Sequence, residues 1–158
     1  MERKLYLTAY SLQRDSTLLA RKILDSRFKP DFLTALWRGG TPVGAYVHEV
    51  LKCHGLNVDH FPIKTSAYEL DQQKKTINLW GLDYLVGKVR ADNSLLIIDD
   101  VFDTGLTNQR VLEEMRALLK ENTPHDIRMA AVYFKPSRNQ TLLKPDFYVK
   151  ETDDWIVF

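Results

Sequence analysis

The chain has 158 residues, the usual size of one domain, so it should bury a single core without a metal or disulfide staple. Lysine and arginine number 22 and aspartate and glutamate 21, and this near balance argues against a protein that binds nucleic acid through bulk positive charge. Hydrophobic residues make up 44% of the chain, which excludes a disordered protein.

The targeting and redox features of the sequence favour the cytoplasm. Cys53 is the single cysteine, which rules out an internal disulfide and fits a reducing compartment. Residues 1–6 lack the apolar core of a signal peptide. No apolar run approaches the roughly 18 residues of a membrane span, so we expect no membrane association.

The first third of the chain predicts strands that alternate with helices. Residues 5–7 form a short strand, and apolar residues at helical spacing then predict a helix capped by Thr8 or Ser11. Residues 32–37 read as a buried strand. A turn at residues 38–41 leads into a second helix with one apolar face.

The middle of the chain contains a polar segment between two predicted core strands. Residues 58–63 form the first of these strands. Residues 64–93 are rich in charged and amide side chains, and we interpret them as an exposed flap with too little apolar content to join the core. A short return strand is expected within this flap at residues 77–80.

The last part of the chain completes the pattern. Residues 94–98 are apolar on both faces, as in a central parallel strand, and a polar loop follows at residues 99–107. Residues 111–119 form an amphipathic helix, and strands are expected at residues 129–134 and 147–149. The alternation predicts a single α/β domain with a twisted, mainly parallel sheet and helices on both faces.

The loop at residues 99–107 has the composition of a binding site. In an open parallel sheet ligands bind at the carboxyl ends of the strands, where Asp99 and Asp100 stand and could accept hydrogen bonds from a sugar diol. Residues 103–107 open a helix whose free N–H groups and positive end favour an anion, and Gly105 permits close approach. This local chemistry suits ribose 5-phosphate. The alternative, that the aspartates only cap a helix, would explain one acid but not three beside an anion loop.

Residues 95–107 resemble the phosphoribosyl-pyrophosphate signature of type I phosphoribosyltransferases. The wider pattern is similar to the hypoxanthine/guanine/xanthine enzymes of purine salvage. Further resemblances follow in order: the pyrophosphate loop at residues 37–40, the mobile flap at residues 65–80, the strand with a base-reading lysine at residues 132–136, and the base-stacking segment at residues 155–158.

This resemblance implies the type I phosphoribosyltransferase fold in one domain over residues 1–158. It implies a flap at about residues 64–93 and a small hood built from about residues 1–8 and 136–158. It also implies a non-proline cis peptide bond between Trp37 and Arg38.

The resemblance further implies a role for each matching residue. Asp99 and Asp100 would bind the ribose hydroxyls, directly or through Mg²⁺, and Asp103 would act as the acid/base group near N7 of the purine. The other implied contacts are the 5-phosphate loop of Asp103, Thr104, Gly105, Leu106 and Thr107; the pyrophosphate loop of Trp37, Arg38, Gly39 and Gly40; Tyr68 in the flap; and Lys135, Trp155 and Ile156 at the base.

The implied activity is transfer of the phosphoribosyl group from phosphoribosyl pyrophosphate to a 6-oxopurine, with Mg²⁺ as cofactor and a homodimer as the assembly. Lys135 favours a 6-oxo group, because adenine presents an amino donor at that position. The alternatives are the same reaction on another nucleobase, or a non-catalytic regulator that senses phosphoribosyl pyrophosphate. The presence of Arg38, Lys135 and Trp155 favours the enzyme over the regulator.

Overall fold

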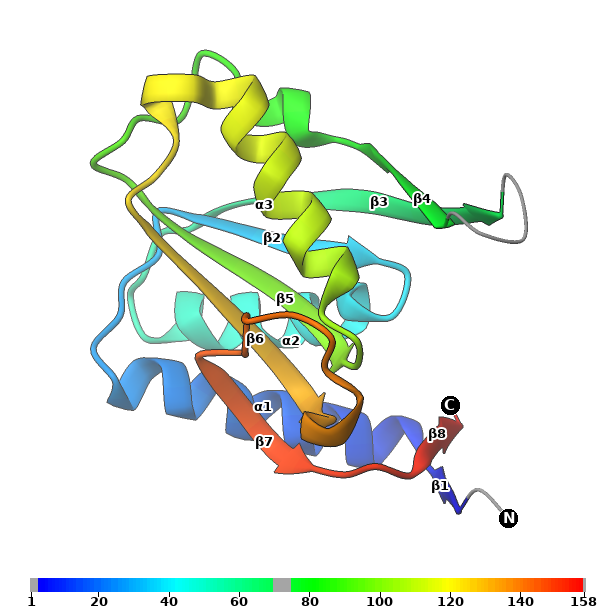
Figure 1. Cartoon of the computed structure of the whole chain (residues 1–158). Helices are drawn as coiled ribbons and strands as arrows, with labels where there is room; N and C mark the ends of the chain where they lie inside the picture. The colour runs from blue at the N-terminus through cyan, green and yellow to red at the C-terminus, as the bar shows by residue number, and fades with distance from the viewer. Residues whose placement is uncertain (1–2, 70–74, 158) are drawn as a thin grey trace.

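The computed structural model describes residues 3–69 and 75–157, apart from the side chains of residues 67–69 and 75–76. Its centre is a six-stranded sheet in the order β4-β3-β2-β5-β6-β7 (Figure 1). All neighbouring pairs are parallel except β3 and β4, which are antiparallel. The strands are β2 (Phe32–Trp37), β3 (Asp59–Glu69), β4 (Lys75–Trp80), β5 (Ser94–Phe102), β6 (Asp126–Phe134) and β7 (Phe147–Glu151).

Helices cover both faces of this sheet, as the sequence predicts. Along β5, Leu96 and Ile98 pack with the apolar faces of α1 (Ala9–Asp25) and α2 (Gly40–Cys53). Leu95 and Ile97 point to the opposite face and pack with α3 (Leu106–Leu119). This alternation explains why β5 is apolar throughout its first half, because a central parallel strand is covered on both sides. Short 3₁₀ helices complete the fold: η1 (Leu82–Leu85), η2 (Lys120–Asn122) and η3 (Pro136–Arg138).

A second, two-stranded sheet joins the two ends of the chain. Strands β1 (Lys4–Tyr6) and β8 (Trp155–Val157) are parallel, with Lys4 opposite Trp155. Helix α1 begins immediately after β1, at a reciprocal capping box. Thr8 is the cap: its Oγ1 accepts the Ser11 N–H at 3.0 Å, and Ser11 Oγ accepts the Thr8 N–H at 3.0 Å. The residues between β7 and β8 therefore lie beside the start of α1 (Figure 1).

Several element boundaries differ from the sequence expectation, and two of the differences concern the candidate site and the flap. Strand β5 does not end at Ile98 but continues to Phe102, so Asp99 and Asp100 belong to the strand, and Asp99 lies opposite Ala131 of β6. The polar side chains misled the prediction, because they look like a loop although the backbone stays paired with β6.

The second correction concerns the proposed flap at residues 64–93. Its first part is the β3–β4 hairpin, in which Lys64 lies opposite Trp80. Its last part is not exposed: Leu82, Leu85 and Val89 are buried in the core cluster that includes α3. Leu82 and Leu85 are three residues apart in η1 and therefore lie on one side of this 3₁₀ turn, which a count of apolar residues does not reveal. Within the described residues, no helix is long and apolar enough to cross a membrane.

Candidate active site

The carboxyl end of β2 forms the first wall of the candidate site. The peptide bond between Trp37 and Arg38 is cis, as the family resemblance predicts. The chain then turns directly into α2, and Gly40 lies against the neighbouring strand, where an added Cβ would stand 2.5 Å from the Ile98 carbonyl oxygen. A Cβ on Gly39 would meet the Asp100 carboxylate. The two glycines therefore let the β2 loop contact the end of β5.

Asp99 and Asp100 lie where this loop meets β5. The Asp100 N–H donates to Asp99 Oδ1 at 2.9 Å, and the Val101 N–H donates to Asp100 Oδ1 at 2.9 Å. Burial, reinforced by the neighbouring Asp100 charge, raises the pKa of Asp99 well above its ordinary value. We find no salt bridge to either carboxylate within residues 3–69 and 75–157.

This acidic pair has the chemistry of a magnesium ligand set. Mg²⁺ prefers carboxylate oxygens and is commonly held by one or two of them together with substrate oxygens. A cation would favour the ionised form of Asp99, which burial disfavours. The residues present therefore fit the ion, although a cluster of three or more acidic or other metal-binding side chains is not found in the described part of the chain.

The segment after β5 has a backbone geometry that suits an anion. Gly105 has a φ of 79° and is the cap residue of α3, with no side-chain hydrogen bond at that cap. Its positive φ suits glycine, and an added Cβ would also stand 2.5 Å from Thr141 Oγ1. A residue outside the loop stabilises its conformation: the Gln140 N–H donates to the Thr104 carbonyl at 2.9 Å. In the first turn the Leu106 N–H makes one long bond, to Thr104 Oγ1 at 3.4 Å. The first N–H groups of a helix have no partner within the helix, so they can donate to an anion at its positive end.

Lys135 brings the end of β6 to this loop. It is only 2% exposed, and its N–H donates to the Phe102 carbonyl at 2.9 Å. Its Nζ lies 4.0 Å from Asp103 Oδ2 and 5.7 Å from the centre of the Trp155 ring. Trp155 itself is 47% exposed. The structure thus assembles Asp103, Lys135 and Trp155, which are implied to act on the base, from three separate strand ends.

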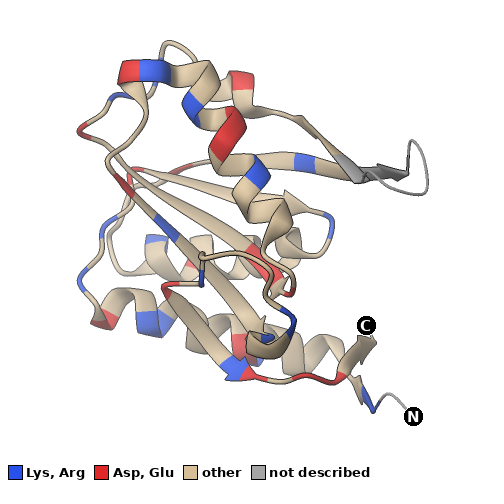
Figure 2. Ribbon diagram, in the orientation of Figure 1, with Lys and Arg blue, Asp and Glu red and all other residues tan. Residues whose placement is uncertain are grey.

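Arg138 is a member of this cluster that the sequence analysis missed. It lies in η3, and its Nε is 2.7 Å from Asp103 Oδ1. Figure 2 shows acidic positions at the end of β5 close to the basic positions that follow β6. The sequence offers one signal for this arginine: Pro136 starts a turn that returns the third residue after Lys135 toward the site.

The remaining implied site residues include Ile156 in β8 and Tyr68 in the β3–β4 hairpin. Ile156 is half-buried in β8 and lies opposite Leu5 of β1. The backbone of Tyr68 lies opposite Thr76 in the β3–β4 hairpin, whereas its side chain is outside the described part of the chain. The hairpin contacts the β2 loop at its base, where Thr65 Oγ1 donates to the Trp37 carbonyl at 3.3 Å.

A separate cavity of about 270 Å³ lies between α2, β2 and β3. Of the implied site residues with described side chains it includes only Trp37, and its polar wall contains His48 and His60, whose rings are 4.2 Å apart. We place the candidate active site at the strand ends rather than in this cavity. Asp99, Asp100, Lys135 and the loop at residues 103–107 converge at the strand ends.

This strand order, with an anion loop after a central parallel strand, defines an α/β protein of the kind that binds ligands at the carboxyl end of its sheet. Residues 7–158 match the model of the phosphoribosyl transferase domain. The chain therefore belongs to the phosphoribosyltransferase family, and its relatives place it in the purine branch of the type I fold.

Two relatives support this assignment, and a third protein supports the fold. A purine phosphoribosyltransferase from Pyrococcus horikoshii OT3 is 30% identical, with a TM-score of 0.72, and the alignment covers 98% of this chain and 92% of that one. Hypoxanthine-guanine phosphoribosyltransferase of Canis lupus familiaris is 33% identical over 95 residues, which span 60% of this chain and 41% of the dog protein. A Neisseria gonorrhoeae protein with bound ppGpp, 23% identical, supports the fold, with a TM-score of 0.80 and coverage of 99% and 88%.

Proposed function

We propose that this protein transfers the 5-phosphoribosyl group of phosphoribosyl pyrophosphate to N9 of a 6-oxopurine and releases pyrophosphate. The observation that carries the proposal is the buried ammonium of Lys135, which lies 4.0 Å from Asp103 and 5.7 Å from the Trp155 ring. A buried lysine next to an exposed aromatic face suits a flat ligand with an oxygen at its edge.

The sugar phosphate is assigned to the segment from β5 into α3. The backbone of residues 103–107, with the Thr104 and Thr107 hydroxyls, would receive the 5-phosphate at the start of α3. Asp99 and Asp100 would accept hydrogen bonds from the ribose hydroxyls and would hold Mg²⁺. When bound, that ion would supply positive charge to the departing pyrophosphate.

The pyrophosphate is assigned to the loop after β2. The guanidinium of Arg38 has the fork geometry that suits phosphate oxygens, and the N–H groups of Gly39 and Gly40 would add donors beside it. Trp37, whose peptide bond to Arg38 is cis, would belong to the same loop. Tyr68 in the hairpin would close over the same group and exclude water from the activated sugar.

The purine is assigned to the cluster at the end of β6. Lys135 Nζ would donate to the oxygen at C6, the Trp155 ring would stack on the base, and Ile156 would contribute backbone groups. As the bond from C1 to pyrophosphate breaks and the bond from N9 to C1 forms, Asp103 would take up the proton that the imidazole ring loses near N7. The acceleration would then come from two effects. The site would hold the purine and the activated sugar in a reactive orientation, and its charges would stabilise the charge that develops in the transition state.

The decisive experiment is a substrate panel. Pyrophosphate release is measured with phosphoribosyl pyrophosphate, Mg²⁺ and, in separate reactions, hypoxanthine, guanine, xanthine, adenine or a pyrimidine base. We expect turnover with one or more 6-oxopurines and little with adenine. Turnover restricted to adenine or a pyrimidine would overturn the substrate assignment. Binding of phosphoribosyl pyrophosphate without turnover of any base would identify a sensor instead.

A variant of Lys135 sharpens the panel. Lys135→Met retains the length and apolar stem of the side chain but removes the donor, so we expect the KM for a 6-oxopurine to rise by about tenfold or more. The KM for phosphoribosyl pyrophosphate should change little. An equal rise in both constants would contradict the assignment of Lys135 to the base.

A homodimeric assembly and a cytoplasmic location complete the proposal. The dimer is what the family resemblance implies, and the location rests on the single cysteine, Cys53, and on the composition of residues 1–6. Sedimentation at several concentrations, with and without phosphoribosyl pyrophosphate, tests the assembly. A mass of one chain at all concentrations would reject the dimer.

A further inference from the structure

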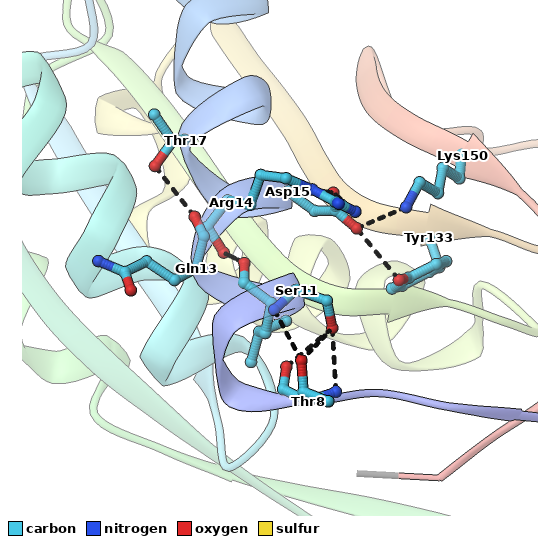
Figure 3. A network of polar contacts seen from close by, with 10 residues as sticks. Thr8, Ser11, Gln13, Arg14, Asp15, Thr17, Tyr133 and Lys150 are labelled. Carbon is cyan, nitrogen blue, oxygen red and sulfur yellow. Dashed lines mark hydrogen bonds and ion pairs between the residues drawn. The ribbon is translucent and has the colours of Figure 1, made fainter.

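A buried carboxylate outside the candidate active site joins three elements of the fold (Figure 3). Asp15, in the second turn of α1, is 0% exposed. Its Oδ2 accepts hydrogen bonds from Lys150 Nζ at 2.7 Å and from the Tyr133 hydroxyl at 3.3 Å. Its Oδ1 accepts two more from the Arg14 guanidinium, at 3.0 and 2.9 Å. One side chain of α1 therefore contacts both β6 and β7.

The charges in this network are compensated. Burial pushes the pKa of Asp15 upward, but the hydrogen bonds from Lys150 and Arg14 outweigh it, so the pKa lies below its ordinary value. Tyr133 is buried, and burial together with the Asp15 charge raises its pKa to about 12. At neutral pH the network is therefore an ionised carboxylate with two cationic donors and one neutral hydroxyl donor.

Both partner strands lead directly into the residues assigned to the base. Tyr133 and Lys150 lie opposite each other on adjacent strands. Tyr133 precedes Lys135 by two residues, and the chain after Lys150 reaches Trp155 five residues later. Between them, the Thr152 N–H donates to the Phe134 carbonyl at 3.0 Å, which keeps the two strand ends paired.

Helix α1 is also connected to Trp155, through strand β1. It starts at the Thr8 capping box, directly after β1, and β1 pairs with the strand that carries Trp155. The Trp155 N–H donates to the Arg3 carbonyl at 2.8 Å. The relative position of α1, β6 and β7 thus determines the relative position of the Lys135 ammonium and the Trp155 ring.

We propose that Asp15 is a positioning residue for purine binding, because it holds the ends of β6 and β7 against α1 and thereby sets the spacing of Lys135 and Trp155. This inference rests on the proposed function. Asp15 is not among the residues assigned to either substrate, and the elements it joins carry none of the residues assigned to the phosphates or ribose. Its loss should therefore weaken binding of the base selectively.

The first test separates the kinetic constants. In Asp15→Asn we expect the KM for the purine to rise by about tenfold, while kcat and the KM for phosphoribosyl pyrophosphate stay within about threefold of the native values. Tyr133→Phe and Lys150→Met each remove one hydrogen-bond donor to Asp15, so each should raise the KM for the purine by a smaller factor and leave the other constants unchanged. They also keep the test available if Asp15→Asn does not fold. Lys150→Arg should restore near-native purine KM.

The matched control is Ser16→Ala. Ser16 is the next residue in α1 and equally buried, but its Oγ donates within the helix, to the Leu12 carbonyl at 2.7 Å. We expect native kinetic constants for this variant. A rise in purine KM in Ser16→Ala as large as that in the network variants would overturn the positioning role, as would equal rises in the KM of both substrates.

A second readout does not depend on turnover. The N–H groups of Lys135 and Trp155 donate to the Phe102 and Arg3 carbonyls. In Asp15→Asn, hydrogen exchange at these two amides should accelerate by a larger factor than at Ile97 in the centre of the sheet, whose exchange follows the global loss of stability alone. Unchanged exchange at these two amides, or an equal increase at Ile97, would overturn the inference. If the native chain turns over no purine, the proposed function fails, and the exchange result still decides the role of Asp15.

Discussion

Arg138 and Asp103 form an ion pair in which Nε lies 2.7 Å from Oδ1. The two side chains are 38% and 33% exposed, so solvent screens the pair and its contribution to stability is small. Its consequence is geometric. Asp103 faces Lys135 with its other oxygen, 4.0 Å away, so the pair with Arg138 favours the orientation in which Oδ2 points to Lys135.

The first prediction concerns this arginine. Arg138→Gln should lower kcat by about tenfold, because the carboxylate assigned to proton transfer loses its fixed orientation. The free energy of unfolding should change by less than about 1 kcal/mol. Steady-state kinetics and urea denaturation measure the two effects.

A similarly exposed arginine elsewhere is the control. Arg110 forms ion pairs with Glu113 and Glu114 on the surface of α3, and it is 41% exposed. Arg110→Gln should leave kcat unchanged. Equal losses of activity in the two variants would show that the Arg138 pair has no specific role.

The second prediction concerns stability at Asp99. Its raised pKa means that the folded protein binds the Asp99 proton more tightly than the unfolded chain does. Its contribution to stability is therefore fully present below about pH 3.9 and is lost as the pH rises toward the folded-state pKa. Asp99→Asn should thus be more stable than the native protein at pH 7 without ligands, and this advantage should vanish near pH 4.

Urea denaturation between pH 4 and 8 measures this difference. Addition of Mg²⁺ and phosphoribosyl pyrophosphate should stabilise the native protein strongly and Asp99→Asn weakly, since the variant loses a proposed ligand. A variant less stable than the native protein at pH 7 would contradict the prediction. Equal stabilisation of both by the ligands would remove Asp99 from the metal and ribose site.

The third prediction has the opposite sign. The pKa of Asp15 is lowered by its donors, so its contribution to stability is present above about pH 3.9 and is lost as the pH falls through the folded-state pKa. Asp15→Asn should cost about 2 kcal/mol at pH 7, a value reduced because Lys150 is 44% exposed. The difference from the native protein should shrink in acid, and a constant difference from pH 7 to pH 2 would refute the role of the charge.

The fourth prediction compares two adjacent glycines. A Cβ on Gly40 would stand 2.5 Å from the Ile98 carbonyl and 2.9 Å from Asp99 Cα, both backbone atoms, so Gly40→Ala should destabilise the protein by about 2 kcal/mol. A Cβ on Gly39 would meet the movable Asp100 carboxylate. Gly39→Ala should therefore fold almost normally but bind phosphoribosyl pyrophosphate poorly. Thermal unfolding and ligand titration distinguish the two, and the reverse order of stability would contradict the contacts described.

Local patterns were sufficient for the architecture and for most of the candidate site. The alternation of apolar strands and amphipathic helices predicts the α/β class, because period and length are properties of short segments. The segment from Asp99 to Thr107 likewise shows its chemistry in one continuous stretch, and so does the loop at residues 37–40, to which pyrophosphate is assigned. These features need no knowledge of what lies across the sheet.

The misplaced boundaries have a common physical cause. Asp99 and Asp100 look like loop residues, but their backbone is part of β5, because strand pairing depends on the neighbouring strand and not on the side chain. Leu82, Leu85 and Val89 are spread through a polar segment and yet are buried, because α3 covers them. In both cases a partner distant in sequence overrides the local composition.

The sequence by itself determined the fold class, the single domain-sized core and the loops that resemble substrate-binding motifs. Only the tertiary structure decided that Arg138 pairs with Asp103 and that Asp15 contacts Tyr133 and Lys150, which are 118 and 135 residues away along the chain. An aspartate in a helix reads as a surface residue, and it becomes a buried link only when two strands supply donors. Such pairings arise from the packing of remote elements, which no local pattern records.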